Sequence, residues 1–297
     1  MSGKRGRLHG LLTAILTPFD MAGILALELI PALLDFQRTA GIDGVVVCGT
    51  NGEGTSLSVD ERKQVLEIVM QYSGHLQVVA GTGATCLTDA LELTRHAASL
   101  RVDAILLLPP FFYKQPPTAG LIDYFLPILD SVDLPMLLYN IPQMTSVPIT
   151  DDLLNALADH PRLAGVKDSA GDWTRTKQLI DNHPQLKIFG GSDFDALRCW
   201  RGGAAGCISG GANPFPEIVA AVRDAVRSGD PVHADAAQDR LNSMLDILVS
   251  FPSVGASKSV LARRGFPKMG VRPSLVNLTE IQEAAMLAEF ADAQMLT

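Results

Sequence analysis

The chain has 297 residues, of which 47% are hydrophobic and 19% charged, and its net charge is −8 at pH 7. This length fits one large domain or two ordinary ones, and the composition supplies ample apolar material for a core. The acidic balance argues against nucleic acid as the main partner, because neutralising phosphates needs basic patches. The apolar stretch 11–20 is too short for a signal peptide or membrane span, so we expect a soluble cytoplasmic protein.

Eight short apolar runs recur along the chain at fairly even intervals, separated by segments with helical patterns. The runs are continuous rather than alternating, which is typical of parallel strands buried on both faces. The predicted strands span residues 11–19, 44–49, 77–83, 104–111, 135–142, 163–169, 187–193 and 204–213.

The helical segments carry recognisable start and stop signals. Ser58 followed by Glu61 forms a capping box. Thr150 is a suitable N-cap for a helix whose first turn carries two acidic residues. The helix after residue 215 has proline near its start and Gly229 past its end.

Eight strands alternating with helices predict a (β/α)8 TIM barrel over residues 1–214. Residues 215–297 show no further clear strand and are expected to form a C-terminal helical segment that completes and flanks the barrel. An open doubly wound sheet is the alternative fold. Such a sheet normally carries a glycine-rich loop after its first strand, and LTPFDMAGIL has no such pattern.

The cysteines and histidines give no sign of a metal site. Cys48, Cys86, Cys199 and Cys207 form no CxxC pair, and we expect all four to be reduced thiols in the core. The six histidines are scattered and form no HxH or HExxH pattern. The sequence therefore predicts no metal ligands.

The sixth apolar run has an unusual end, because the apolar LAGV is followed at once by Lys167. Catalytic groups of a barrel project from the C-terminal ends of its strands. If Val166 packs against the helices, alternation points Lys167 into the barrel mouth and Asp168 away from it. Burial there disfavours the ammonium form, and the neutral amine can attack a carbonyl to form a Schiff base. A solvated lysine at the start of a loop is the alternative.

Two further elements lie at neighbouring strand ends. Tyr139 closes the fifth strand, where a phenol can relay protons, although it can equally be a core tyrosine with a satisfied hydroxyl. The stretch GTNGEG (49–54) follows the second strand, and its turns can expose N–H groups to a carboxylate. Thr50 is placed to bond both that carboxylate and Tyr139. An ordinary loop leading into a capped helix is the alternative reading of this segment.

Together these elements resemble the dihydrodipicolinate synthase / N-acetylneuraminate lyase family of class I pyruvate-dependent aldolases. The family's GTTGE is matched by GTNGE (49–53), its YNxP by YNIP (139–142) and its GxKD by GVKD (165–168). The order of the motifs and their strand positions agree along essentially the whole chain.

The resemblance implies a role for each matched residue. Lys167 forms the imine with the keto group of pyruvate, and Tyr139 relays protons. Thr50 and Asn51 hold the carboxylate, and the backbone at Ile208 helps to line the lysine pocket. No metal or organic cofactor is implied. The family also implies a homotetramer built as a dimer of dimers.

The chain departs from the synthases at three places. Asn51 replaces the second threonine of the family motif, and Met144 stands where the synthases carry a carboxylate-binding arginine. The family lends a tyrosine across the subunit interface, but Phe112 aligns best with it here and Tyr113 follows. A phenylalanine carries no protons, so Tyr113, water or the substrate would have to complete the relay.

The stretches GGSDF (190–194) and GGANPFPE (210–217) resemble the 2-keto-3-deoxygluconate aldolases more than the synthases. Ser192 and Asp193 are then expected to bond hydroxyls of a sugar-acid tail, with a helix cap at Asp193 as the structural alternative. Phe194 stands where the lyases carry an acidic residue that binds the polyol, so N-acetylneuraminate fits poorly.

The expected function is therefore a Schiff-base aldolase that joins or cleaves pyruvate and an aldehyde through a 2-keto-3-deoxy sugar acid. Its alternatives are 4-hydroxy-tetrahydrodipicolinate synthase, a keto-sugar-acid dehydratase or decarboxylase, and a non-catalytic keto-acid sensor. A metal-dependent aldolase is a further option that the missing ligand pattern opposes. The expected partners are small molecules, with no nucleic acid and no membrane.

Overall fold

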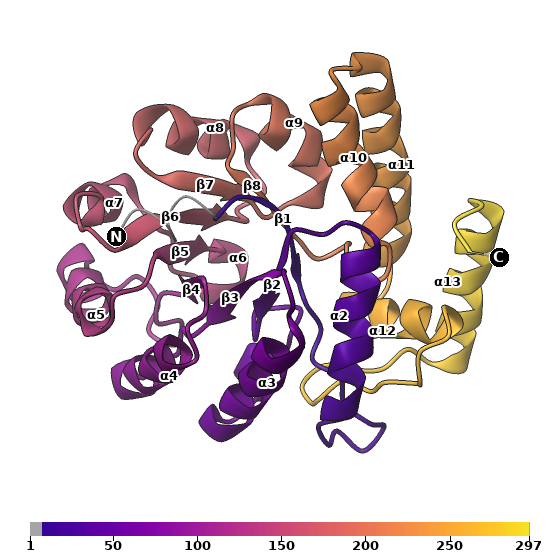
Figure 1. Cartoon of the computed structure of the whole chain (residues 1–297), viewed down its shortest axis with the longest axis horizontal. Coiled ribbons are helices and arrows are strands. Elements are labelled where there is room, and N and C mark those ends of the chain that lie inside the picture. Colours follow the sequence, from indigo (N-terminus) through magenta and orange to yellow (C-terminus); the bar gives the residue numbers. More distant parts are fainter. Residues whose placement is uncertain (1–7, 297) are drawn as a thin grey trace.

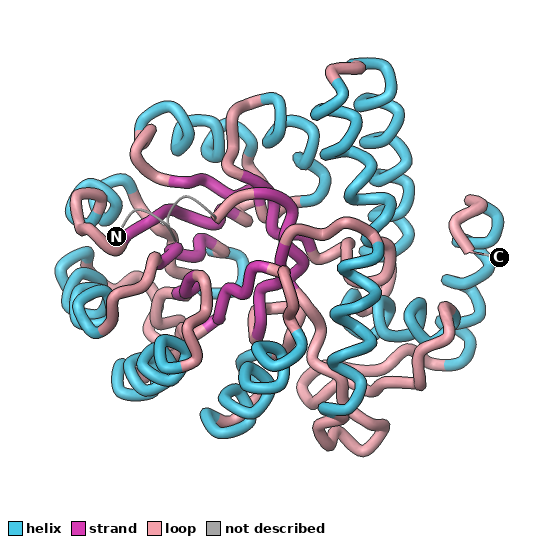
Figure 2. The backbone as a smooth tube through the Cα atoms, viewed as in Figure 1, coloured by secondary structure: helices cyan, strands magenta, loops and turns pink. Residues whose placement is uncertain are grey.

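The computed structural model describes residues 8–296 and confirms the predicted (β/α)8 barrel. Eight parallel strands pair in chain order, and β1 pairs with β8 to close the ring (Figure 1). Helices surround the strands on the outside (Figure 2). The strands are β1 (Gly10–Ala14), β2 (Gly44–Val47), β3 (Gln77–Gly81), β4 (Ala104–Leu107), β5 (Met136–Asn140), β6 (Leu163–Asp168), β7 (Lys187–Gly190) and β8 (Gly206–Ser209).

All eight predicted strands are present, but the predictions placed all of their C-terminal ends too far along the chain. The first apolar run was expected to be extended as far as Phe19, whereas β1 stops at Ala14. Ile15, Leu16 and Phe19 are nevertheless buried. The apolar pattern therefore records burial of the loops at this end of the barrel, and only its first part records strand pairing.

The helix start and stop signals that were predicted from the sequence are present. The capping box of Ser58 and Glu61 and the N-cap at Thr150 are both present, and Gly229 ends its helix in the left-handed conformation. The helices up to β8 are α2 (Ile30–Thr39), α3 (Val59–Tyr72), α4 (Leu87–Ser99), α5 (Thr118–Ser131), α6 (Pro142–Thr145), α7 (Asp151–Leu157), α8 (Trp173–Asn182) and α9 (Ala196–Arg201). Short 3-10 turns occupy Leu27–Leu29, Gly54–Ser56 and Asp193–Asp195.

The core has separate layers inside and outside the strand ring. Val46 of β2 belongs to the cluster that fills the barrel, whereas Val45 and Val47 pack in the cluster between strands and helices. This alternation explains why the strands read as continuous apolar runs, since both faces of each strand are buried. The inner cluster includes Tyr139 and Ile208, so the interior is filled by side chains.

The segment after β8 is helical and lies along one side of the barrel (Figure 1). Its helices are α10 (Pro216–Ser228), α11 (Pro231–Val249), α12 (Ser253–Arg263) and α13 (Glu280–Asp292). Phe215 and Phe290 pack with ring centroids 4.9 Å apart in the cluster shared by these helices. One isolated bridge, between Gly270 and Phe19, joins the segment to the loop after β1. Between residues 8 and 296, no helix taken singly has the length and apolar character to cross a membrane.

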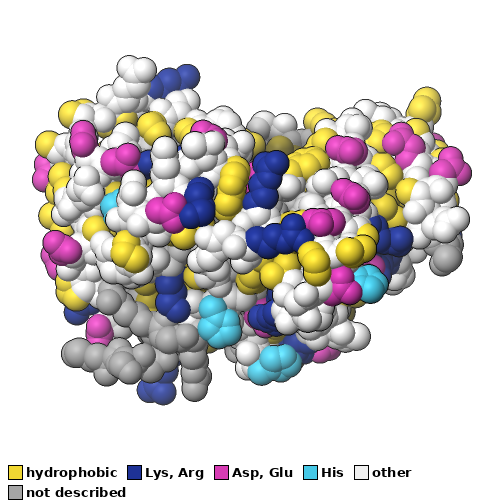
Figure 3. Space-filling view, turned by 90° about the horizontal axis from the view of Figure 1, so that it is seen from above, with side chains coloured by type: hydrophobic (Ala, Val, Ile, Leu, Met, Phe, Trp, Pro, Cys, Tyr) yellow, Lys and Arg dark blue, Asp and Glu magenta, His cyan; other side chains and the backbone are white. Residues whose placement is uncertain are grey.

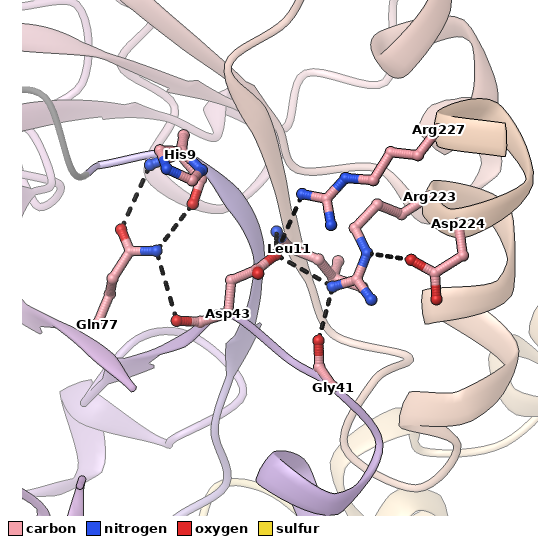
Figure 4. Close-up of polar contacts among 8 residues, drawn as sticks. All are labelled: His9, Leu11, Gly41, Asp43, Gln77, Arg223, Asp224 and Arg227. Atoms are coloured by element: carbon pink, nitrogen blue, oxygen red, sulfur yellow. Dashed lines mark hydrogen bonds and ion pairs between the residues drawn. The ribbon is translucent and has the colours of Figure 1, made fainter. Parts of the chain in front are cut away.

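A polar network joins strands and helix at the N-terminal end of the barrel (Figure 4). The Asp43 carboxylate accepts hydrogen bonds from the backbone N–H of Leu11 at 2.8 Å and from Arg223 Nη1 at 3.1 Å. Arg223 also donates to the carbonyl of Gly41 at 2.7 Å and to Asp224 at 2.8 Å. The network therefore ties α10 to the starts of β1 and β2, at the end of the barrel opposite the predicted site.

The surface carries charges of both signs. Figure 3 shows acidic and basic side chains interspersed over one face of the molecule. The prediction that all four cysteines lie in the core is wrong for Cys86, which is exposed, whereas Cys48, Cys199 and Cys207 are buried. Cys86 occupies the N-cap position of α4, in the turn directly before the first helical residue.

Candidate active site

Lys167 and Tyr139 meet at the C-terminal ends of β6 and β5. Their Cα atoms are partners in the parallel ladder, and both side chains are buried, with 3% of each residue exposed. The Lys167 Nζ lies 4.1 Å from the centroid of the Tyr139 ring. The structure thus places the amine inside the barrel mouth and excludes the solvated alternative.

The sequence around Lys167 fixes this orientation. Val166 packs outward among the helices, and Asp168 also points outward, where its carboxylate accepts hydrogen bonds from Asn140 at 2.7 Å and Thr176 at 2.6 Å. Gly165 allows β7 to approach, because a Cβ there would lie 1.9 Å from the carbonyl oxygen of Lys187. The Asp168 carboxylate is therefore hydrogen-bonded on the outside of the barrel and does not pair with Lys167, as predicted.

Electrostatics favour proton exchange at Tyr139. Burial alone would raise the pKa of its phenol, but the positive charge of Lys167 and the hydrogen bond with Thr50 outweigh that effect and bring the pKa below its ordinary value. The hydroxyls of Thr50 and Tyr139 lie 3.3 Å apart, which is the contact predicted from the sequence. A phenol with a lowered pKa beside an amine is suited to give and take protons.

The loop after β2 brings Asn51 towards the end of β8. A Cβ at Gly210 would lie 3.0 Å from Asn51 Nδ2, so the glycine leaves room for the Asn51 side chain. Gly52 and Gly54 are equally constrained, because a Cβ on either would meet backbone atoms of the loop or of the segment that follows β1. Backbone packing therefore fixes the shape of this loop.

The remaining predicted residues border the same end of the barrel. Ile208 lies buried inside the barrel on β8. Asp193 is buried just after β7, and its Oδ2 accepts a hydrogen bond from the N–H of Gly211 at 2.8 Å. Burial raises the pKa of the Asp193 carboxyl, which hydrogen bonds and the Lys167 charge only partly counter. Ser192 precedes the short 3-10 turn and makes no side-chain cap to it.

Sequence reasoning missed Ser169. Its Oγ is buried near the Tyr139 hydroxyl but has no partner with hydrogen-bond geometry among residues 8–296. A Cβ at Gly191 would lie 1.9 Å from this oxygen, so the hydroxyl sits between the ends of β6 and β7. The only indication of its role in the sequence is its position, two residues after Lys167.

Apart from Asn51, which is half-buried, the residues singled out as departures from the synthases and lyases lie on the surface. Phe112 and Tyr113, in the loop after β4, are exposed and pack edge to face with ring centroids 5.3 Å apart. Met144 in α6 and Phe194 after β7 are also exposed. In the part of the chain that the structure describes, no three His, Cys, Asp or Glu side chains are grouped to hold a metal ion.

Comparison with known proteins identifies relatives over nearly the full chain. The chain is 42% identical over 288 residues to an "Uncharacterized DapA-like lyase" of Chloroflexus aurantiacus, covering 95% of this chain and 96% of the relative. It is 35% identical over 293 residues to the 4-hydroxy-tetrahydrodipicolinate synthase of Hyphomonas neptunium, covering 97% and 99%.

Solved structures agree in fold. YagE of Escherichia coli K12, crystallised with pyruvate, matches with a TM-score of 0.91 and 27% identity, covering 97% of this chain and 99% of that one. A catalytic lysine mutant of the Ruminococcus gnavus sialic acid aldolase matches with a TM-score of 0.91 and 26% identity, covering 97% of each chain. The model of the dihydrodipicolinate synthetase family matches residues 7–292. The chain therefore belongs to the dihydrodipicolinate synthetase family, whose members are lyases.

Proposed function

We propose that the protein is a class I aldolase that cleaves or forms a 2-keto-3-deoxy sugar acid through a Schiff base between pyruvate and Lys167. The observation that carries this proposal is the burial of the Lys167 amine 4.1 Å from the ring of Tyr139, whose hydroxyl lies 3.3 Å from that of Thr50. A buried amine, a phenol with a lowered pKa and a neighbouring hydroxyl are the parts that imine chemistry needs.

In the cleavage direction, the neutral Lys167 amine attacks the C2 carbonyl of the keto acid, and loss of one water molecule gives an iminium ion. The C3–C4 bond then breaks, and its electron pair moves toward the iminium nitrogen to form an enamine. The C4 hydroxyl loses its proton as the aldehyde forms. Protonation of the enamine at C3, followed by addition of water at C2, releases pyruvate and restores the amine.

Tyr139 is the group best placed to move these protons. Its lowered pKa makes the phenolate accessible to accept the C4 hydroxyl proton, and the phenol formed in this way can then protonate the enamine at C3. The Thr50 hydroxyl lies within hydrogen-bond distance of the Tyr139 hydroxyl, and Thr50 directly precedes Asn51. The loop can therefore hold the substrate carboxylate beside the Tyr139 phenol. The loop would orient pyruvate so that C2 faces the amine.

The aldehyde half is proposed to be a small uncharged hydroxyaldehyde. Met144 offers no charge to a second carboxylate, which argues against the amino-aldehyde of the synthases. Ser169 supplies a buried hydroxyl that has no partner with hydrogen-bond geometry among the described residues 8–296, and Ser192 and Asp193 border the same end of the barrel. Hydroxyl groups on the substrate would satisfy these polar groups.

Product analysis by NMR with a panel of 2-keto-3-deoxy sugar acids tests this function. Formation of pyruvate and a hydroxyaldehyde in equal amounts is the expected result. A dehydrated or decarboxylated keto acid as the product would show that the protein is a dehydratase or decarboxylase that acts through the same imine. Condensation of pyruvate with aspartate semialdehyde would favour the synthase, and an imine without turnover of any aldehyde would favour a sensor.

We also propose that the protein assembles as a homotetramer. Support comes from the exposed aromatic pair Phe112 and Tyr113, which bury little of their surface in a single chain. Contiguous exposed aromatic side chains mark protein interfaces. Light scattering coupled to size-exclusion chromatography should give four times the 31.7 kDa chain mass. A monomer would contradict the proposed assembly.

A further inference from the structure

A fully buried ion pair links the C-terminal segment to the loop that carries Thr50 and Asn51. The Lys258 Nζ in α12 donates to Glu53 Oε1 at 2.6 Å, and the two side chains are 1% and 0% exposed. Lys258 also donates to the carbonyl of Gly270 at 2.7 Å. The partners are 205 residues apart in sequence, so the fold alone brings them together.

The second oxygen of Glu53 is held by the same segment. Glu53 Oε2 accepts the backbone N–H of Arg272 at 2.9 Å. The Arg272 guanidinium donates to the carbonyl of Ser56 at 3.0 Å and forms two hydrogen bonds, of 2.8 and 2.6 Å, to the Glu61 carboxylate. Both cations contact the ring of Phe19, whose centroid lies 4.6 Å from Lys258 Nζ and 4.5 Å from the Arg272 guanidinium carbon.

The loop that these contacts hold has a strained backbone. Cys48 and Glu53, which flank the loop, are left-handed with φ values of 56° and 52°. Non-glycine residues adopt this conformation only where their surroundings impose it. The N–H of Glu53 donates to the carbonyl of Thr50 at 3.1 Å, so the conformation of Glu53 is transmitted directly to Thr50 and Asn51.

We propose that Lys258 and Glu53, supported by Arg272, are positioning residues that hold the Thr50–Asn51 loop in the shape that binds the keto-acid carboxylate. This inference rests on the proposed function and adds to it a task for the C-terminal segment. The pair lies behind the loop and is fully buried, so it acts through the loop and has no contact with the substrate.

The design of the test follows from the energetics of buried charges. Removing one partner of a buried pair leaves the other charge uncompensated and destabilises the whole fold, whereas replacing both by neutral groups of similar size is often neutral. Lys258→Met alone therefore confounds positioning with stability. The double variant Glu53→Gln, Lys258→Met removes the tether to α12 while leaving no buried charge, and the amide oxygen that replaces the carboxylate can still accept the Arg272 N–H.

The measurement is the rate of borohydride-trapped adduct against concentration, for pyruvate and for its neutral amide, pyruvamide. In the double variant, the half-saturating concentration of pyruvate should rise about tenfold, the loss expected for one hydrogen bond to a charged group. That of pyruvamide, which has no carboxylate, should stay within about twofold of the unmodified protein. Both variants are expected to melt at a lower temperature than the unmodified protein. The decrease should be smaller for the double variant than for Lys258→Met alone.

Two further variants keep the test decisive. Arg272→Met removes a partly exposed clamp, so it should fold even if the double variant does not, and it should change the pyruvate value in the same direction by about threefold. Lys187→Met is the matched control. Lys187 also donates to a backbone carbonyl, that of Leu8 at 2.9 Å, but it lies at the start of β7, away from the Thr50–Asn51 loop. Its substitution should leave the half-saturating concentrations of pyruvate and pyruvamide unchanged.

An unchanged pyruvate value in the double variant, or in Arg272→Met if the double variant does not fold, would overturn the positioning role. An equal rise for pyruvate and pyruvamide would also overturn it, since the pair would then support the barrel as a whole. The proposed function fails separately, through absence of any adduct in the unmodified protein.

Discussion

The Lys167 amine stands over the face of the Tyr139 ring, 4.1 Å from its centroid, and the two residues are ladder partners on adjacent strands. Strand pairing therefore sets their separation, and neither depends on a flexible loop for its position. The charge of Lys167 also helps to bring the pKa of the Tyr139 phenol below its ordinary value. One geometric relationship thus places the proposed nucleophile beside its proton carrier and adjusts the carrier's acidity.

Tyr139→Phe should separate imine formation from proton transfer. The variant keeps the ring beside Lys167 but loses the hydroxyl, so kcat for aldol cleavage should fall by about 10²- to 10⁴-fold, the usual contribution of a general acid–base group. The adduct trapped with pyruvate and borohydride should still form, though more slowly. Retention of most of the turnover would show that another group moves the protons.

The pH profile should report the lowered pKa of Tyr139. In the cleavage direction the phenolate accepts the C4 hydroxyl proton, so kcat should rise as pH rises through the Tyr139 pKa, and this limb should lie below the ordinary phenol value of about 10. Thr50→Val removes a hydrogen bond that favours the phenolate, so the pKa should rise and the limb should move to higher pH. A limb that stays in place or moves to lower pH would argue against this assignment.

Asp43→Ala should weaken the barrel without affecting chemistry. It leaves the buried Arg223 guanidinium and the Leu11 N–H without their shared partner, and should lower the free energy of unfolding by about 2 kcal/mol. Asp224→Ala, the control, removes an exposed partner of the same arginine and should cost about 0.5 kcal/mol or less. Urea unfolding of both variants checks the difference, and equal losses would contradict it.

Thiol labelling should distinguish the exposed cysteine from the buried ones. Cys86 is exposed, and hydrogen bonding from Thr88 lowers the pKa of its thiol, so it should react first with iodoacetamide. Burial raises the pKa of Cys48 to about 11, which makes that thiol unreactive in the folded state. Mass spectrometry of tryptic peptides at short reaction times should find Cys86 alone modified. Modification of Cys48 at a similar rate would contradict the burial of its thiol in the folded protein.

Local patterns in the sequence were sufficient to predict the architecture. Continuous apolar runs such as 44–49 arise because Val45 and Val47 face the helices while Val46 faces the barrel interior. Alternation along β6 likewise predicted that Lys167 points inward and Asp168 outward. These features depend on residues close together in the chain, where periodicity carries the information.

Features that depend on distant contacts could not be predicted. The pairing of Glu53 with Lys258 joins residues 205 positions apart, and nothing near either residue indicates its partner. Strand ends were placed too late because buried loop residues such as Leu16 are as apolar as strand residues. Cys86 was assigned to the core from its small and apolar neighbours, although it lies in the exposed turn before α4.

Borohydride reduction in the presence of pyruvate, followed by peptide mass mapping, tests the central claim most directly. The account predicts a single stable adduct on the peptide that contains Lys167, which adds the mass of pyruvic acid less one oxygen atom because imine formation releases water and reduction adds two hydrogens. No adduct should form in a Lys167→Met variant. The absence of any adduct in the unmodified protein, or an adduct on another lysine that persists in Lys167→Met, would contradict it.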